Sequence, residues 1–190
     1  MKFSSIAILF FVSVAILGCG NREKNDTTTS NKNTAKKEYI KQAVVTDIKL
    51  HTVRGDEIVF TKEKDNLKLK NSNNKIILLN FFATWCPPCK AEIPHLVNLQ
   101  KKYKNRLKII SVLLEDDKPD SEIKSFIKYN HINYIVTNGA NNFKLSNLLG
   151  GIQNIPFMIL YDKNGKVLTH YIGIIPEEMI DSDIKKAIKK

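Results

Sequence analysis

Two cysteines, Cys86 and Cys89, stand at the junction between an apolar run and a helical pattern, with two prolines between them. A cysteine at the start of a helix lies at the positive end of the helix dipole, which stabilises its thiolate. The prolines cost little there, because the first-turn N–H groups of a helix have no intrahelical partner. We therefore expect dithiol–disulfide exchange, with Cys86 near the surface as the attacking thiolate and Cys89 one turn deeper as the resolving thiol.

Two other uses of such a pair fit the sequence less well. A zinc site needs four ligands, and the chain has no second cysteine pair. A permanent structural disulfide that closes so short a loop would remove little entropy from the unfolded chain. The histidines have no metal-ligand spacing and are expected on the surface or in packing; they are His51, His95, His131 and His170.

The elements that must position the cysteines are predicted by hydrophobic periodicity. Residues 75–83 form a nearly continuous apolar run, typical of a strand buried on both faces of a parallel or mixed sheet. Residues 87–104 carry apolar side chains at helical spacing, and 107–114 form a second buried strand. This order implies a right-handed βαβ crossover.

The rest of the domain is predicted from turns and shorter patterns. Hairpins are expected around Gly55-Asp56 and around 162–165, and the helix at 120–130 is expected to be capped by Asp120 or Ser121. The remaining predicted elements are strands at 44–51, 57–61, 67–69, 134–137, 157–161 and 166–172, and helices at 142–149 and 176–190.

Two segments resemble the thioredoxin-fold thiol–disulfide oxidoreductases, and more narrowly the membrane-tethered bacterial group of TlpA, ResA and the cytochrome c maturation thioredoxins. They read NFFATWCPPCKAEIP at 80–94 and GIQNIPFMILYDKNGKV at 151–167. The resemblance covers residues 43–190 and implies an α/β thioredoxin fold, with a central mixed β-sheet flanked by helices. The leading hairpin resembles the N-terminal addition of this group, and 119–137 resembles its central helix–strand insertion.

The resemblance also assigns substrate-binding residues. Pro156 falls where the family carries a cis proline facing the active-site disulfide, and the backbone of Ile155 would then pair with the substrate chain. Without the family, an ordinary proline at the start of a strand would be the simpler interpretation. Trp85 precedes Cys86, and Pro87 and Pro88 lie between the cysteines; the resemblance implies that all three contact the substrate. Packing alone would also explain Trp85.

The resemblance gives Glu92 a catalytic role. It lies one helical turn beyond Cys89 and resembles the acidic residue that ResA-like proteins use to tune the thiol pKa and to shuttle a proton. The alternative is a charge on the helix surface. Ordinary thioredoxins carry a buried Asp in the preceding strand where this chain has Asn80, which argues against a general cytoplasmic thioredoxin.

The N-terminal segment has the features of a targeting signal. The apolar run from Ile6 to Leu17 is about a dozen residues, short of the roughly 20 that span a bilayer. The closing residues 16–19 resemble the lipobox of bacterial lipoproteins, which implies a signal peptide at 1–18 and a lipid on Cys19; a plain signal peptide or an uncleaved anchor is the alternative. Residues 19–42 are polar and charged, as expected of a flexible tether before the domain at 43–190.

Composition narrows the class of protein. The chain has 190 residues, 43% of them hydrophobic, which fits one globular domain with an appendage and excludes a protein with many membrane spans. The formal charge of +11 comes from lysines spread along the chain without an arginine cluster, so no nucleic-acid role is expected.

Together these features predict a lipid-anchored, extracytoplasmic oxidoreductase on the periplasmic side that needs no dissociable cofactor and no metal. The resemblance implies that it reduces protein disulfides, with apocytochromes c as one candidate substrate and a membrane thiol transporter as electron donor. An oxidase or isomerase of secreted proteins is the main alternative. A non-catalytic binding module or metallochaperone is disfavoured, because a copper site would want clustered Met, Cys or His and the chain has only Met1, Met158 and Met179.

Overall fold

The computed structural model describes residues 45–189 of the chain. The predicted signal peptide, Cys19 and the predicted tether lie outside these residues. In chain order the elements are β1 (Val45–Thr52), β2 (Glu57–Glu63), β3 (Asn66–Leu69), β4 (Ile76–Phe82), α1 (Pro87–Lys102), β5 (Leu107–Leu113), α2 (Asp120–Tyr129), β6 (Ile135–Asn138), α3 (Asn141–Leu148), β7 (Phe157–Tyr161), β8 (Val167–Ile172) and α4 (Glu177–Ile188). The predicted elements are all present, with ends shifted by at most two or three residues.

The sheet is mixed and has β4 near its centre. Its strand order is β3-β2-β1-β6-β5-β4-β7-β8. Every residue of β4 is buried, and the strand pairs in parallel with β5 and antiparallel with β7. The apolar run in the sequence is therefore explained by helices and strands that cover both faces of this strand, and the predicted fold class is confirmed.

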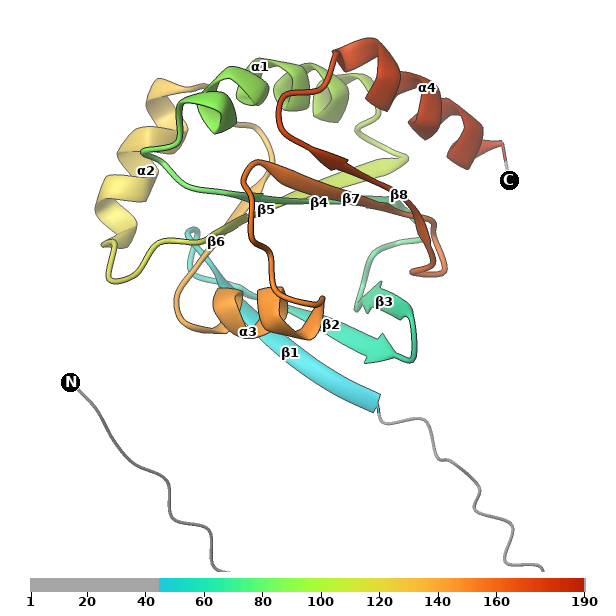
Figure 1. Cartoon of the computed structure of the whole chain (residues 1–190), viewed down its shortest axis with the longest axis horizontal. Helices are drawn as coiled ribbons and strands as arrows, with labels where there is room; N and C mark the ends of the chain where they lie inside the picture. Colours follow the sequence, from blue (N-terminus) through green and yellow to red (C-terminus); the bar gives the residue numbers. More distant parts are fainter. Residues whose placement is uncertain (1–44, 190) are drawn as a thin grey trace, which may run out of the picture. The chain divides into compact units, whose positions relative to one another are not determined.

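Helices lie on both sides of the sheet. Figure 1 shows α1, α2 and α4 along one side and α3 on the other, beside β1. The side chains of α1 and α4 share a core with β4 and β5, through residues such as Leu96, Leu107 and Ile180. A second core lies between the first three strands, α3 and the opposite face of β4, and includes Leu50 and Phe81, both fully buried.

The N-terminal strands form the predicted hairpin and are extended by β3. β1 pairs antiparallel with β2 along seven positions but meets β6 at only two. The free side of β3 is held by the β7–β8 turn, where the Leu67 N–H donates to the Gly165 carbonyl at 2.8 Å. A Cβ on Gly165 would come within 2.5 Å of the Leu67 carbonyl oxygen, so the close approach requires glycine at this position.

One predicted detail of α2 is wrong. Neither Asp120 nor Ser121 caps this helix; its N-cap is Pro119, which makes no side-chain cap hydrogen bond. The Asp120 carboxylate instead accepts a hydrogen bond from Asn138 at 2.9 Å and lies 3.1 Å from the His51 ring. The side chain is thus used to join α2 to the sheet. Among residues 45–189, no helix is long and apolar enough to cross a bilayer.

Candidate active site

The two cysteines form a disulfide at the start of α1. Their Cα atoms are 5.3 Å apart, which confirms the predicted pairing. Cys86 is the N-cap of the helix, and its Sγ lies 3.2 Å from the Cys89 backbone N–H, which points toward it. Pro87 and Pro88 occupy the first two helical positions, where their missing N–H groups leave no hydrogen bond unmade. When the disulfide is reduced, the same N–H can stabilise a Cys86 thiolate.

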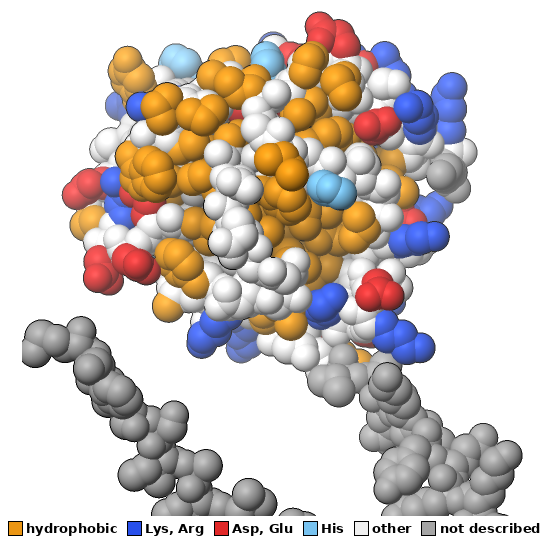
Figure 2. All heavy atoms as spheres, in the orientation of Figure 1, with side chains coloured by type: hydrophobic (Ala, Val, Ile, Leu, Met, Phe, Trp, Pro, Cys, Tyr) orange, Lys and Arg blue, Asp and Glu red, His pale blue; other side chains and the backbone are white. Residues whose placement is uncertain are grey.

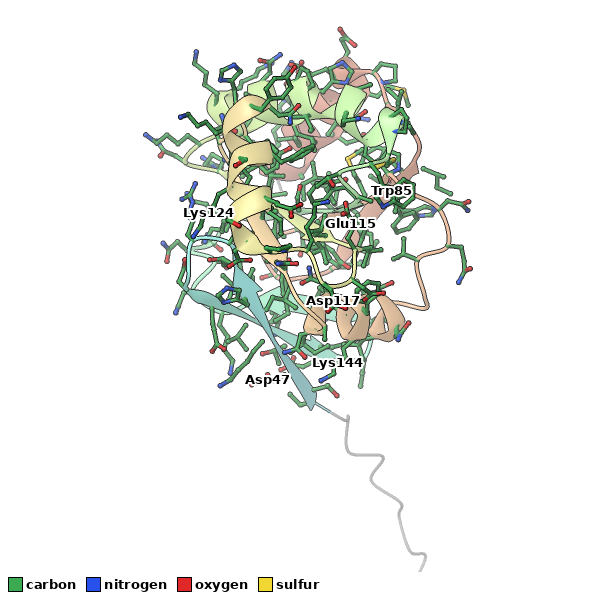
Figure 3. All side chains as sticks on the ribbon, turned by 90° about the vertical axis from the view of Figure 1, so that its left-hand side faces the viewer. Asp47, Trp85, Glu115, Asp117, Lys124 and Lys144 are labelled. Atoms are coloured by element: carbon green, nitrogen blue, oxygen red, sulfur yellow. A yellow bond between two sulfur atoms is a disulfide. The ribbon has the colours of Figure 1, made fainter. Side chains whose placement is uncertain are left out.

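The expectation that Cys86 lies nearer the surface than Cys89 is wrong for this oxidised form. Both residues are only 3% exposed. Cys86 and Cys89 are buried because they belong to the same hydrophobic core as Phe82, Ala83 and Ile93. The neighbouring Trp85 is exposed, with 65% of it accessible to solvent; Figure 3 shows it at the side of the domain.

The loop before β7 faces the disulfide, as the resemblance implied. The Ile155–Pro156 peptide bond is cis, and Pro156 is buried. The Ile155 carbonyl oxygen lies 3.9 Å from Cys86 Sγ. A disulfide sulfur has no hydrogen to donate, so this is a contact that becomes available to an S–H group only after reduction. The predicted neighbours Cys86, Ile155 and Pro156 are therefore brought together from segments about 70 residues apart.

An apolar groove begins next to this loop. Phe157 follows Pro156, and the groove has a volume of about 290 Å³. Its lining is largely apolar and includes Leu148, Leu149, Phe157, Ile159, Val167 and His170. Figure 2 shows hydrophobic side chains gathered over the middle of the face that carries α3 and β8, with charged side chains mostly around its border. Neither Cys86 nor Ile155 lines this groove.

Glu92 is buried in the core-facing stripe of α1. The stripe consists of Cys89, Glu92, Ile93, Leu96 and Leu99. Glu92 is 1% exposed, and its Oε2 accepts a hydrogen bond from the Ile175 N–H at 3.0 Å. Its Oε1 lies 3.6 Å from His95 Nδ1. Burial raises the pKa of Glu92, and the Ile175 N–H and the nearby imidazole oppose that rise only in part. The alternative of a charge on the helix surface is thus excluded.

Further polar groups lie in the sheet beneath α1. Asn80 is 4% exposed, and its side-chain amide donates to the Ser111 hydroxyl at 2.9 Å. Tyr134 is 4% exposed; burial raises its pKa, the Ser111 hydroxyl opposes the rise, and the charge of Glu92 adds to it. Tyr134 therefore stays protonated near neutral pH, and Asn80 is neutral, so Glu92 is the acidic group of this region.

The loop before Cys86 is fixed by Glu115, which follows β5. The Thr84 N–H donates to Glu115 Oε1, and Lys118 Nζ lies 2.9 Å from Glu115 Oε2. Burial raises the pKa of Glu115, but the hydrogen bonds from Lys118 and Thr84 outweigh it and hold the pKa below its usual range. An ionised carboxylate thus anchors the backbone beside Trp85. Figure 3 labels both Trp85 and Glu115.

Three groups at the site were missed by the sequence reasoning. His95 was expected to be a surface or packing residue, although its position three residues after Glu92 on a helix is a signal that the side chains can meet. Glu115 and the Ile175 N–H contact the site only through the tertiary fold, and no sequence spacing announces them. Within residues 45–189, no three His, Cys, Asp or Glu side chains form a group suited to a metal ion.

The Redoxin family model matches residues 28–188 of the chain. The chain belongs to the Redoxin family. Thiol-disulfide oxidoreductase ResA of Bacillus thuringiensis is 32% identical to this Redoxin over 132 residues, which are 68% of this chain and 73% of that relative. ResA of Halalkalibacterium halodurans is 27% identical over 122 residues, 63% of this chain and 66% of that one. With its Cys86–Cys89 pair, this Redoxin is a thiol–disulfide oxidoreductase of the ResA-like group.

Solved structures agree with the fold. A thiol:disulfide interchange protein of the thioredoxin family from Chlorobium tepidum is 27% identical, with a TM-score of 0.59, and covers 77% of this chain and 97% of its own. The pneumococcal exposed lipoprotein thioredoxin Etrx1 from Streptococcus pneumoniae is 22% identical, with a TM-score of 0.60, and covers 74% of this chain and 99% of its own. The predicted thioredoxin fold is confirmed by these likenesses.

Proposed function

We propose that this Redoxin works as a reductase of protein disulfides. The observation that carries the proposal is the buried carboxyl of Glu92, which lies one turn beyond Cys89 among the buried residues of α1. A negative charge there opposes thiolate formation. Strong oxidants of this chemistry are oxidising because their reduced, thiolate form is stabilised, so the opposite arrangement favours a low reduction potential.

The reaction follows from the placement of the two sulfurs. The Cys86 thiolate attacks one sulfur of the substrate disulfide; that S–S bond breaks, and the other substrate sulfur leaves with the electron pair as a thiolate. Cys89 then gives its proton to the Glu92 carboxylate and attacks Cys86 Sγ. The mixed disulfide breaks, the Cys86–Cys89 bond forms, and the second substrate sulfur leaves as a thiolate. The substrate has gained the two electrons that the dithiol has lost, and its thiolates take protons from water.

Substrate binding is assigned to the groups around the disulfide. The Ile155 backbone, beside the cis Pro156, is the pairing edge for an extended peptide. Trp85 and Pro87 are exposed and offer apolar contact at the other side of Cys86, with Pro88 partly exposed behind them. Neither the Ile155 backbone nor these apolar contacts would select a particular side chain of the substrate. Recognition of this kind suits unfolded extracytoplasmic proteins, and apocytochromes c are the candidate substrates.

The cellular setting is part of the same proposal. Residues 16–19 resemble a lipobox, so Cys19 would carry a lipid, and residues 19–42 would tether the domain to the outer side of a bacterial membrane. A membrane thiol transporter would return electrons to the Cys86–Cys89 disulfide. Cys19→Ser is expected to release the protein from the membrane fraction into the soluble extracytoplasmic fraction; a variant that stays with the membrane would overturn the lipid anchor.

The reduction potential of the Cys86–Cys89 pair tests the direction. Equilibration of the full chain with graded dithiol buffers at pH 7 should give a value below about −220 mV. A value above about −150 mV would instead make the protein an oxidase or isomerase. Cys86→Ser should abolish exchange, and Cys89→Ser should trap the mixed disulfide with the substrate. A Cys86→Ser variant that keeps its function in cells would point to a binding module.

A further inference from the structure

The Glu92–His95 contact leaves two buried polar atoms facing each other. Glu92 Oε1 and His95 Nδ1 are both inaccessible to solvent, and neither has a hydrogen-bond partner among residues 45–189. They are 3.6 Å apart, just beyond hydrogen-bond distance. Buried polar atoms are nearly always paired, so two orphans at this separation indicate that each is the intended partner of the other.

The two side chains differ in their access to water. The Glu92 side chain is 1% exposed, whereas the His95 side chain is 32% exposed. The other carboxylate oxygen of Glu92, Oε2, is already occupied by the Ile175 N–H. Oε1 is therefore the free oxygen, and the atom it faces belongs to a ring that reaches the surface. The imidazole forms a path of one side chain between a buried carboxyl and solvent.

The proposed reaction can use such a path. Cys89 must lose its proton each time it resolves a mixed disulfide, and both Cys89 and Glu92 are buried. At 1% exposure the Glu92 carboxyl does not meet bulk water, so a proton that it accepts reaches water during the resolution step only through a group that extends to the surface. Imidazole is suited to this transfer, because it can accept a proton on one nitrogen and release one from the other.

We propose that His95 is the proton relay of this Redoxin, passing the proton that Glu92 takes from Cys89 out to solvent. The inference rests on the proposed role of Glu92 in disulfide reduction. When the substrate is reduced, the Cys89 S–H bond breaks, the Glu92 O–H bond forms and breaks, and an N–H bond forms at His95 Nδ1 while the other ring nitrogen releases a proton to water. When the Cys86–Cys89 disulfide is reduced again, the reverse transfers return a proton from water to Cys89 and restore the imidazole tautomer. The carboxylate and the neutral imidazole are restored, so the relay consumes no other reactant.

The surrounding elements offer no second route of this kind among residues 45–189. From the sheet, Tyr134 faces Glu92 but is kept protonated by burial. From the segment before α4, only the Ile175 backbone N–H reaches the carboxyl. Glu177, at the start of α4, accepts a hydrogen bond from Asn98 at 2.9 Å on the next turn of α1. Within α1, Cys89 lies one turn before Glu92 among the buried residues of the helix. The proton exit therefore runs through His95.

Dependence on buffer concentration distinguishes a relay from a structural contact. The variants are His95→Phe, which keeps a ring, and His95→Gln, which keeps a polar side chain but cannot take up a proton. The control is His131→Asn, at an exposed position with φ of 55°, where Asn is well tolerated. Single-turnover kinetics with the full chain would separate the attack of Cys86 from the resolution by Cys89, at pH 7 and with imidazole varied at constant ionic strength.

Both His95 variants should resolve the mixed disulfide about tenfold more slowly than wild type at low buffer concentration, and added imidazole should restore the rate. The attack of Cys86 on the substrate should keep its wild-type rate. Wild type and His131→Asn should not respond to imidazole. A His95 variant that resolves at the wild-type rate, or one that is slow but insensitive to imidazole, would overturn the relay.

A second measurement keeps the inference testable if one variant folds poorly. In the oxidised full chain, where Cys86 and Cys89 do not titrate, the Glu92 carboxyl can be followed by NMR with ¹³C-labelled glutamate. Loss of the imidazole should raise the pKa of Glu92 further, because one of the attractions opposing its rise is removed. An unchanged pKa of Glu92 in the His95 variants would contradict the proposed interaction between Glu92 and His95. Glu92→Gln separates the two proposals: if it also leaves resolution fast, the role of Glu92 fails, whereas slow resolution with normal His95 variants removes only the relay.

Discussion

Two buried carboxylates lie along helix α1, one near each end, and they differ in the number of hydrogen-bond donors around them. Near its start, Glu92 has one backbone N–H donor and an imidazole 3.6 Å away. Near its end, Asp181 of α4 has three donors within 2.7 Å, from Lys102, Lys185 and Tyr103. One carboxylate is left partly unpaired beside the disulfide, and the other is fully paired where two helices pack.

The difference appears in the direction of the two pKa shifts. Burial dominates at Glu92 and raises its pKa. Burial also raises the pKa of Asp181, but the hydrogen bonds from its lysine and tyrosine donors outweigh it and hold the pKa well below the usual range. Burial and Asp181 in turn raise the pKa of Tyr103 to about 12. The carboxyl that holds its proton to higher pH than usual thus lies at the redox end, while the carboxylate at the other end serves stability.

The largest expected effect comes from removing the proton acceptor at the redox end. Glu92→Gln keeps the size of the side chain and can still accept from the Ile175 N–H, but it cannot take a proton from Cys89. Resolution of the mixed disulfide should fall on the order of 100-fold at pH 7. Single-turnover kinetics with a small disulfide substrate would measure it. Equal rates for both proteins would contradict the assigned role.

Removing the carboxylate at the other end should affect stability alone. Asp181→Ala strands Lys102 and Tyr103 without their partner and should lower the free energy of unfolding by about 2 kcal/mol in urea denaturation. Because the folded-state pKa lies below the ordinary 3.8, this stabilisation is complete above pH 3.8 and is lost as the pH falls through the folded-state pKa. Glu178→Ala, on an exposed position of the same helix, is the matched control. A slower thiol–disulfide exchange reaction in Asp181→Ala would contradict the expectation that this carboxylate affects stability alone.

Glu115 sharpens the contrast, because it lies beside the active-site loop and yet is well paired. Glu115→Gln keeps an acceptor for the Thr84 N–H but loses the ion pair with Lys118. We expect a loss of about 1 kcal/mol in the free energy of unfolding, with the pH profile of exchange unchanged. A shift of that pH profile in Glu115→Gln would show that proximity to the disulfide matters more than pairing.

The smallest effect is a change of stability with pH. Since the folded-state pKa of Glu92 lies above the ordinary 4.5, the native state binds this proton more tightly than the unfolded state, and the free energy of unfolding falls as the pH rises from 4.5 through the folded-state pKa. Glu92→Gln lacks this fall. Its stability relative to wild type should therefore increase as the pH rises above 4.5, as measured by denaturation of the oxidised proteins. A constant difference would show that the folded-state pKa of Glu92 is not raised.

Much of the fold could be predicted because the strong signals are local. The run of apolar residues in β4 and the helical spacing in α1 depend on burial alone, and both elements lie where the sequence predicts them. The cap of α2 was mispredicted because Asp120 is a good N-cap residue by type. In the fold its carboxylate meets Asn138 and His51 instead, and this competition between a local and a tertiary partner is invisible in the chain.

The site could be predicted in part for the same reason. The cysteine spacing and the Ile155–Pro156 dipeptide are local, and the structure brings them together. Glu92 was assigned by resemblance, although its place in the apolar stripe between Cys89 and Ile93 is itself a sequence signal for burial. The exposure of Cys86 was mispredicted because a position at a helix start does not show what packs over it. Contacts such as Thr84 with Glu115 require the sheet to be assembled first.

The two prolines between the cysteines have a further consequence for the charge that the site can hold. The start of a helix ordinarily presents up to four unpaired N–H groups to an anion. Here two of the positions have no N–H at all, and the Lys90 N–H already donates to the Cys86 carbonyl at 3.1 Å. A Cys86 thiolate is left with the single N–H of Cys89. The prolines thus remove N–H donors that would otherwise stabilise a negative charge on the Cys86 sulfur.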